Sequence, residues 1–119
     1  MAVVVNLTYF QSWALAFALT QLVEMPIYRA LAPVSWGRAF SASLVTHPAV
    51  WYVIPPLCES AGMSWGQTLW LAEGFAYVVE AALLRAYGVR WLRAIAVSCA
   101  ANTASMVVGE LIRARWGIP

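Results

Sequence analysis

Long apolar runs, separated by short polar connections, dominate the pattern along this chain. Each run is about as long as a bilayer-spanning helix, which needs roughly 20 residues. Alternation of apolar and polar residues at period 2, the mark of a strand, is absent. The pattern predicts helices over Phe10–Tyr28, Ala39–Cys58, Gln67–Ala86 and Leu92–Ile112. We therefore expect one all-α domain over residues 1–119, a four-helix transmembrane bundle.

Composition indicates that these helices lie in a membrane. Apolar residues make up 63% of the 119 positions and charged residues only 10%, whereas a soluble domain carries about 25% charged residues. So little charge excludes a nucleic-acid-binding protein, a disordered chain and a disulfide scaffold. The expected partners are the lipid bilayer and either further copies of the chain or other membrane subunits.

The arginines predict an orientation. Those in or beside the first and third connections are Arg29, Arg38, Arg85, Arg90 and Arg93, and those on the opposite side are Arg113 and Arg115. Cytoplasmic loops carry the excess of basic residues. Both termini should therefore lie outside, most simply in the inner (plasma) membrane of a bacterium.

An internal repeat divides the chain into two hairpins, about residues 8–58 and 64–114, with a one-residue gap at Pro33. The matched pairs that composition alone seldom aligns are Glu24 with Glu80, Arg29 with Arg85, Trp36 with Trp91, Arg38 with Arg93 and Ser43 with Ser98. Each hairpin enters and leaves on the same side. The two repeats should therefore be parallel, related by an axis along the membrane normal.

The few polar residues inside the predicted spans form the candidate site. A charged residue in a span costs about 2.5–3.5 kcal/mol on insertion scales, so such residues normally face the bundle interior. The candidates for binding a proton or a cation are Glu24, Glu80, His47, Asn102 and Glu73. The supporting polar residues are Ser43, Ser98, Ser105 and Gln21.

Two glutamates at the same depth, Glu24 and Glu80, cannot both stay ionised unless a cation neutralises them. They would share a proton, face a protonated His47, or hold a divalent metal ion together with His47. Simpler explanations stay open. The serines and Asn102 can serve helix packing, and His47 can cap backbone groups freed by Pro48.

The segments Glu24-Met-Pro-Ile-Tyr28, Thr46-His47-Pro48 and Asn102-Thr-Ala-Ser105 resemble small four-span prokaryotic membrane proteins of uncharacterised activity. This resemblance implies a helical bundle and no particular activity. A fainter likeness is to the CAAX-protease-like intramembrane peptidases, which use Glu, His and Asn. It implies matching roles for Glu24 or Glu80, for His47 and for Asn102, although the paired Glu-Glu and the second His of that family are missing.

Three functions are compatible with this sequence. The first is transport or binding of protons or a cation, which would need an oligomer because four short helices scarcely enclose a pathway. The second is a non-enzymatic subunit or assembly factor of a larger membrane complex. The third is a minimal intramembrane hydrolase, although no motif assigns a catalytic residue.

Overall fold

The computed structural model describes residues 6–117, and this part of the chain is all-helical, as predicted. Its elements, in chain order, are α1 (Tyr9–Leu31), α2 (Trp36–Pro48), the π-helical stretch η1 (Ala49–Val53), α3 (Ile54–Ser60), α4 (Trp65–Ala86) and α5 (Trp91–Trp116). The observed helices extend the predicted spans by up to a few residues at most ends.

The first helix of each hairpin begins with the same local device. The Thr8 side chain caps α1 and exchanges hydrogen bonds with Gln11, and Ser64 does the same for α4 with Gln67. In such a capping box, the side chain of the cap residue accepts from the backbone N–H of the third helical residue, and the side chain of that residue accepts from the backbone N–H of the cap residue. Both boxes occupy corresponding positions of the sequence repeat.

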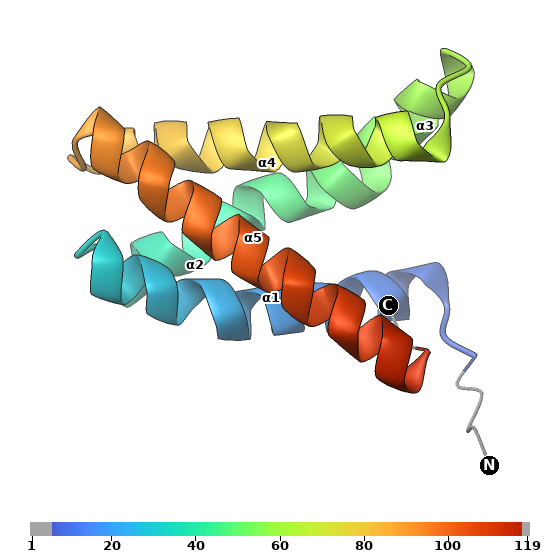
Figure 1. Cartoon of the computed structure of the whole chain (residues 1–119), viewed down its shortest axis with the longest axis horizontal. Coiled ribbons are helices and arrows are strands. Elements are labelled where there is room, and N and C mark those ends of the chain that lie inside the picture. The colour runs from blue at the N-terminus through green and yellow to red at the C-terminus, as the bar shows by residue number, and fades with distance from the viewer. Residues whose placement is uncertain (1–5, 118–119) are drawn as a thin grey trace.

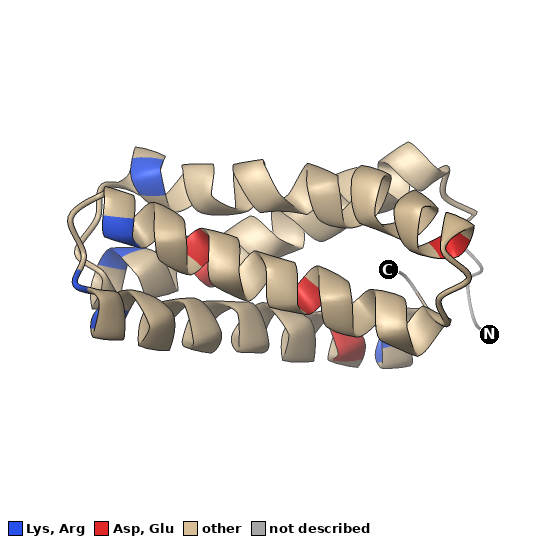
Figure 2. Cartoon of the chain, turned by 90° about the horizontal axis from the view of Figure 1, so that it is seen from above, with Lys and Arg blue, Asp and Glu red and all other residues tan. Residues whose placement is uncertain are grey.

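The two hairpins, α1–α2 and α4–α5, stand side by side (Figure 1). Helices α1 and α4 run in the same direction, and both hairpin turns lie at one end of the bundle. Each of these four helices packs on the other helix of its own hairpin and on one helix of the second hairpin. Helix α1, for example, packs on α2 and on α5. Figure 2 shows most of the basic residues at the end with the two turns, while Arg113 and Arg115 lie at the other end, on the last turns of α5.

The predicted helix over Ala39–Cys58 is helical throughout, but its hydrogen-bond pattern changes to that of a π-helix over η1. Pro55 lacks an N–H and cannot donate to the carbonyl of Trp51, four residues earlier. The carbonyl of Trp51 accepts instead from the Tyr9 hydroxyl of α1. Prolines are a usual cause of such local departures from the α-helical ladder.

Burial is inverted relative to a soluble protein. Glu24 and Glu80 are each 1% exposed, whereas Leu92 is 84% and Trp70 83% exposed. Within residues 6–117, α5 is the one helix both long and apolar enough to cross a membrane. Helices α2 and α3 are short individually, and α1 and α4 contain Trp, Tyr, Gln and Thr residues that lower their mean hydropathy.

Corresponding positions of the two hairpins are buried alike. Ala39 and Ala94 are both fully buried, and Ser43 and Ser98 are at most 1% exposed. From Trp36 to Thr46 and from Trp91 to Ala101, the buried positions coincide throughout. The same face of each hairpin therefore forms the core.

Candidate functional site

Glu24, on α1, lies at the centre of the bundle and is held by hydroxyl groups from two other helices. Ser105 of α5 donates to Glu24 Oε1 at 2.6 Å, and Ser43 of α2 donates to Glu24 Oε2. Both carboxyl oxygens thus have a neutral donor. Glu24 is fastened to the second helix of each hairpin.

Glu80, its counterpart on α4, is held in a similar way by different residues. Tyr28 of α1 donates to Glu80 Oε1 at 2.8 Å, and Thr46 of α2 donates to Oε2 at 3.2 Å. The Ser43 hydroxyl lies 3.4 Å from Glu80 Oε1. Because Ser43 contacts both glutamates, the two carboxyl groups form one cluster across the interface of the hairpins.

No basic side chain neutralises this pair of glutamates within the described residues. The one ion pair there joins Arg113 to the exposed Glu110 at 3.2 Å, on the last turns of α5. Buried charges in proteins are normally paired or bound to a metal. The hydrogen-bond donors to this carboxyl pair are therefore all neutral hydroxyl groups.

Asn102 and Ser98, both on α5, complete the cluster on the side of Tyr28. The Asn102 amide nitrogen lies 3.4 Å from the Tyr28 hydroxyl and 3.0 Å from the Ser98 carbonyl oxygen. Ser98 itself donates to the carbonyl of Tyr77 on α4. Asn102 therefore contacts the glutamate pair through Tyr28.

His47 lies beside the cluster, in an aromatic environment. Its ring is stacked on Trp51 with centroids 6.0 Å apart and meets the edge or face of Phe17 at 5.5 Å. Nε2 is 3.5 Å from the Thr20 hydroxyl, and Nδ1 is buried without a partner. Among the described residues, no hydrogen bond joins the His47 ring to a backbone group, so the alternative in which His47 caps groups freed by Pro48 has no support.

The positions of Glu24, Glu80 and His47 bear on the divalent metal ion that the sequence left open. Within residues 6–117, no three His, Cys, Asp or Glu side chains come together as a metal site would need. No hydrogen bond joins His47 to either glutamate among these residues, and its Nε2 lies near the Thr20 hydroxyl instead.

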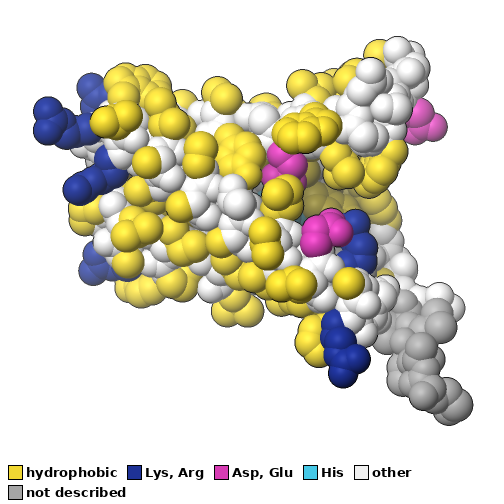
Figure 3. Space-filling view, in the orientation of Figure 1, with side chains coloured by type: hydrophobic (Ala, Val, Ile, Leu, Met, Phe, Trp, Pro, Cys, Tyr) yellow, Lys and Arg dark blue, Asp and Glu magenta, His cyan; other side chains and the backbone are white. Residues whose placement is uncertain are grey.

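A cavity of about 270 Å³ connects these residues. Glu24, Glu80, His47, Asn102 and Ser105 all line it. It extends to the end of the bundle opposite the hairpin turns, where Glu73 and Glu110 belong to its lining. Figure 3 shows one face of the bundle, which has a hollow with acidic side chains at its rim. Glu73, a predicted candidate for binding a proton or a cation, thus lies on the wall of this cavity.

Toward the hairpin turns the bundle is closed. Tyr28 and Leu84, each one turn beyond a glutamate, are fully buried, as are Ala39 and Ala94 opposite them. They belong to one apolar cluster that continues to Val34 and Val89 in the turns. The glutamate pair is therefore accessible from one end of the bundle and sealed from the other.

Two of the residues that hold the glutamates were not among the predicted site residues. Tyr28 and Thr46 provide the donors to Glu80. The sequence held one signal for Tyr28, because it follows Glu24 by one helical turn and so lies on the same face of α1. Gln21 is buried, but its amide donates to the backbone carbonyl of Phe40 at 3.0 Å. It supports the packing of α1 on α2 outside the glutamate cluster.

Comparison with protein-family models, with curated proteins and with solved structures yields no match. The resemblance to small four-span prokaryotic membrane proteins stays a prediction.

Proposed function

We propose that this chain is a small membrane protein whose Glu24–Glu80 pair takes up and releases protons. The observation that carries the proposal is a buried pair of carboxyl groups with only neutral hydroxyl donors, lining a cavity open toward one end. An acid pair in this setting exchanges a proton more readily than it holds a metal ion, because too few metal ligands surround it.

The inverted burial supports the proposed membrane placement. Helices α1, α4 and α5, and the continuous stretch from Trp36 to Ser60, are each long enough for a bilayer core, which needs roughly 20 residues. Their outer faces carry exposed leucines and tryptophans while the acids lie inside. Lipid would cover these outer faces without the cost that water imposes.

Orientation follows from the basic end of the bundle. Five arginines lie at or beside the two hairpin turns. Because cytoplasmic loops carry the excess of basic residues, this supports a cytoplasmic location of that end and both termini outside. The cavity would then open to the outside, and the apolar cluster at Tyr28 and Leu84 would form the cytoplasmic seal.

A duplicated hairpin explains how the pair arose. Glu24 and Glu80 occupy equivalent positions of two parallel repeats with matching capping boxes and matching burial. Two identical ancestral hairpins would have placed the same acid twice beside one axis. In the present chain, the donors around each acid have diverged.

Transfer of protons across the membrane needs a route through the cytoplasmic seal, and the apolar outer faces leave room for a second copy of the chain. We therefore include a homo-oligomer in the proposal. The non-enzymatic subunit is the competing function, and in it the glutamate pair would only hold the four helices together.

The test is proton flux into liposomes that contain the purified chain and a pH-sensitive dye. The parent should acidify the lumen under an imposed potential, and Glu24→Gln/Glu80→Gln should not. Glu59→Gln is the matched control, because Glu59 is exposed at the end of α3. Equal flux in parent and double variant, with both folded, would exclude the proposal and favour the subunit.

Infrared spectroscopy provides a second readout that does not depend on transport. A protonated carboxyl group has a C=O absorption distinct from that of a carboxylate. The parent should show this band in detergent at neutral pH, and Glu24→Gln/Glu80→Gln should lose it. Its absence from the parent, together with tightly bound sodium or calcium, would replace the proton with a cation.

A further inference from the structure

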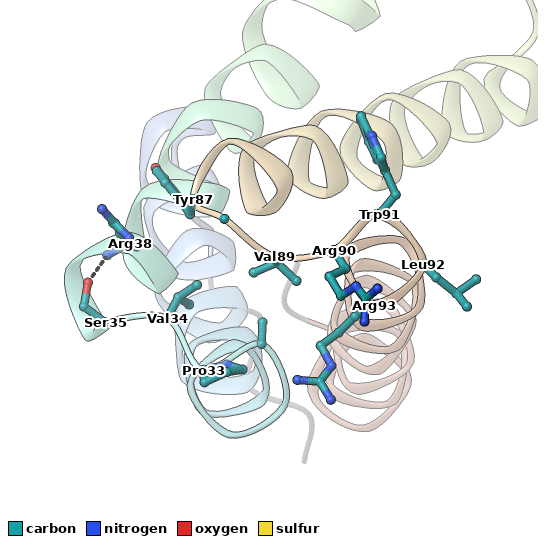
Figure 4. Close-up of a pocket in the computed structure, with 12 residues that line it drawn as sticks. Pro33, Val34, Ser35, Arg38, Tyr87, Val89, Arg90, Trp91, Leu92 and Arg93 are labelled. Atoms are coloured by element: carbon teal, nitrogen blue, oxygen red, sulfur yellow. Dashed lines mark hydrogen bonds between the residues drawn. The ribbon is translucent and has the colours of Figure 1, made fainter.

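A second cavity, separate from the glutamate cluster, lies between the two hairpin turns. Its volume is about 860 Å³, and both turns and the first residues of α2 and α5 line it. Arg38 stands on the α2 side, with Arg90 and Arg93 on the α5 side (Figure 4). Three arginines thus belong to the lining of one cavity.

These arginines have no acidic partner within residues 6–117, where the one ion pair is at the other end of the bundle. Arg38 is held in place by the ring of Tyr87, whose centroid is 5.1 Å from its guanidinium carbon. Like charges gathered around a cavity repel one another unless an anion lies between them. The cluster therefore favours an anionic ligand.

The remaining lining indicates which kind of anion fits. Ser35 accepts the Arg38 backbone N–H and keeps its own hydroxyl proton to donate. The floor is apolar, with Val34 and Val89 buried, and Trp91 and Leu92 stand exposed at the rim. Guanidinium groups bind phosphate oxygens in pairs, and exposed apolar side chains beside them suit an acyl chain.

We propose that this cavity binds the phosphate of an anionic lipid headgroup, with the acyl chains along the exposed face of α5 that begins at Leu92. The site would lie at the cytoplasmic surface, where basic pockets between helices bind such headgroups. This inference rests on the membrane placement proposed above. It does not depend on what the glutamate pair does.

The experiment measures lipid binding to the detergent-purified chain by native mass spectrometry. Phosphatidylglycerol should stay bound at lipid concentrations where phosphatidylcholine, which has no net charge, does not. Arg90→Gln/Arg93→Gln should weaken phosphatidylglycerol binding by about tenfold or more. The variant should fold normally, as judged by circular dichroism, because both side chains are exposed.

Arg85→Gln is the control, since it removes a charge from the same end at an exposed residue that does not line the cavity. It should bind phosphatidylglycerol like the parent. An equal loss of phosphatidylglycerol binding in this control would show that surface charge alone attracts the lipid, and would overturn the proposed site. Equal binding of phosphatidylcholine, or full displacement of the lipid by millimolar inorganic phosphate, would overturn the lipid headgroup as the ligand.

The two proposals fail separately. Glu24→Gln/Glu80→Gln should keep parental lipid binding, and Arg90→Gln/Arg93→Gln should keep the infrared band of the protonated carboxyl group. A loss of that band in the arginine variant would show that the cavity and the glutamate cluster are one site, which contradicts this inference.

Discussion

The Tyr28 hydroxyl donates to Glu80 Oε1 at 2.8 Å across the centre of the bundle, joining residues 52 positions apart in the chain. It links α1 of the first hairpin to α4 of the second, two helices that run in the same direction. Tyr28 is fully buried and Glu80 is 1% exposed. The bond therefore ties the two hairpins together at the level of the candidate site.

Tyr28→Phe should destabilise the fold by about 1–2 kcal/mol, because it leaves a buried carboxyl oxygen without its donor. Unfolding by increasing SDS, followed by circular dichroism, measures the change. Tyr77→Phe is the control, since its hydroxyl bonds to Thr103 on the exposed side and should cost less. A Tyr28→Phe variant as stable as the control would mean that Glu80 finds another donor.

His47→Phe should fold with a stability within about 1.5 kcal/mol of the parent, because an aromatic ring of similar size keeps the contacts with Trp51 and Phe17. His47→Ala should cost more, about 2–4 kcal/mol, since it leaves a hole among the rings. The same SDS titration compares them. A Phe variant that unfolds as easily as the Ala variant would show that the contact with Thr20 matters more than the ring.

Tyr9→Phe should destabilise the parent by about 1 kcal/mol, because the carbonyl of Trp51 loses the donor that replaces the missing N–H of Pro55. In a Pro55→Ala background the restored N–H can serve that carbonyl, so Tyr9→Phe should have almost no effect. A double-mutant cycle on unfolding free energies measures the coupling. Additive effects would show that the proline and the tyrosine are unrelated.

Single cysteines at Pro33 or Ala86 should resist an impermeant thiol reagent applied to intact cells, and one at Ala61 should react. All three positions are exposed. Two other positions in the hairpin turns are less suitable for a cysteine, because Ala32 is buried and Gly88 has a φ of +96°, which suits glycine. The background should carry Cys99→Ser because Cys99 is exposed. Labelling at Pro33 and Ala86 alone would reverse the proposed orientation.

The helical content, the turns and the identity of the rare buried acids could be predicted from the order of residues alone. The reason is physical: a run of about 20 apolar residues without strand periodicity has few alternatives to a helix, and an acid such as Glu24 inside it must face inward. Equivalent positions such as Glu24 and Glu80 likewise follow from the repeat before any contact is known.

Tertiary structure alone decided which groups serve which acid. Tyr28 and Thr46 reach Glu80, while Ser105 reaches Glu24, because these contacts depend on how four helices rotate and pack against one another. Packing also placed His47 among aromatic rings, and the stretch before Pro55 became π-helical. Periodicity along one helix shows which face is buried, and only the assembled bundle shows what that face meets.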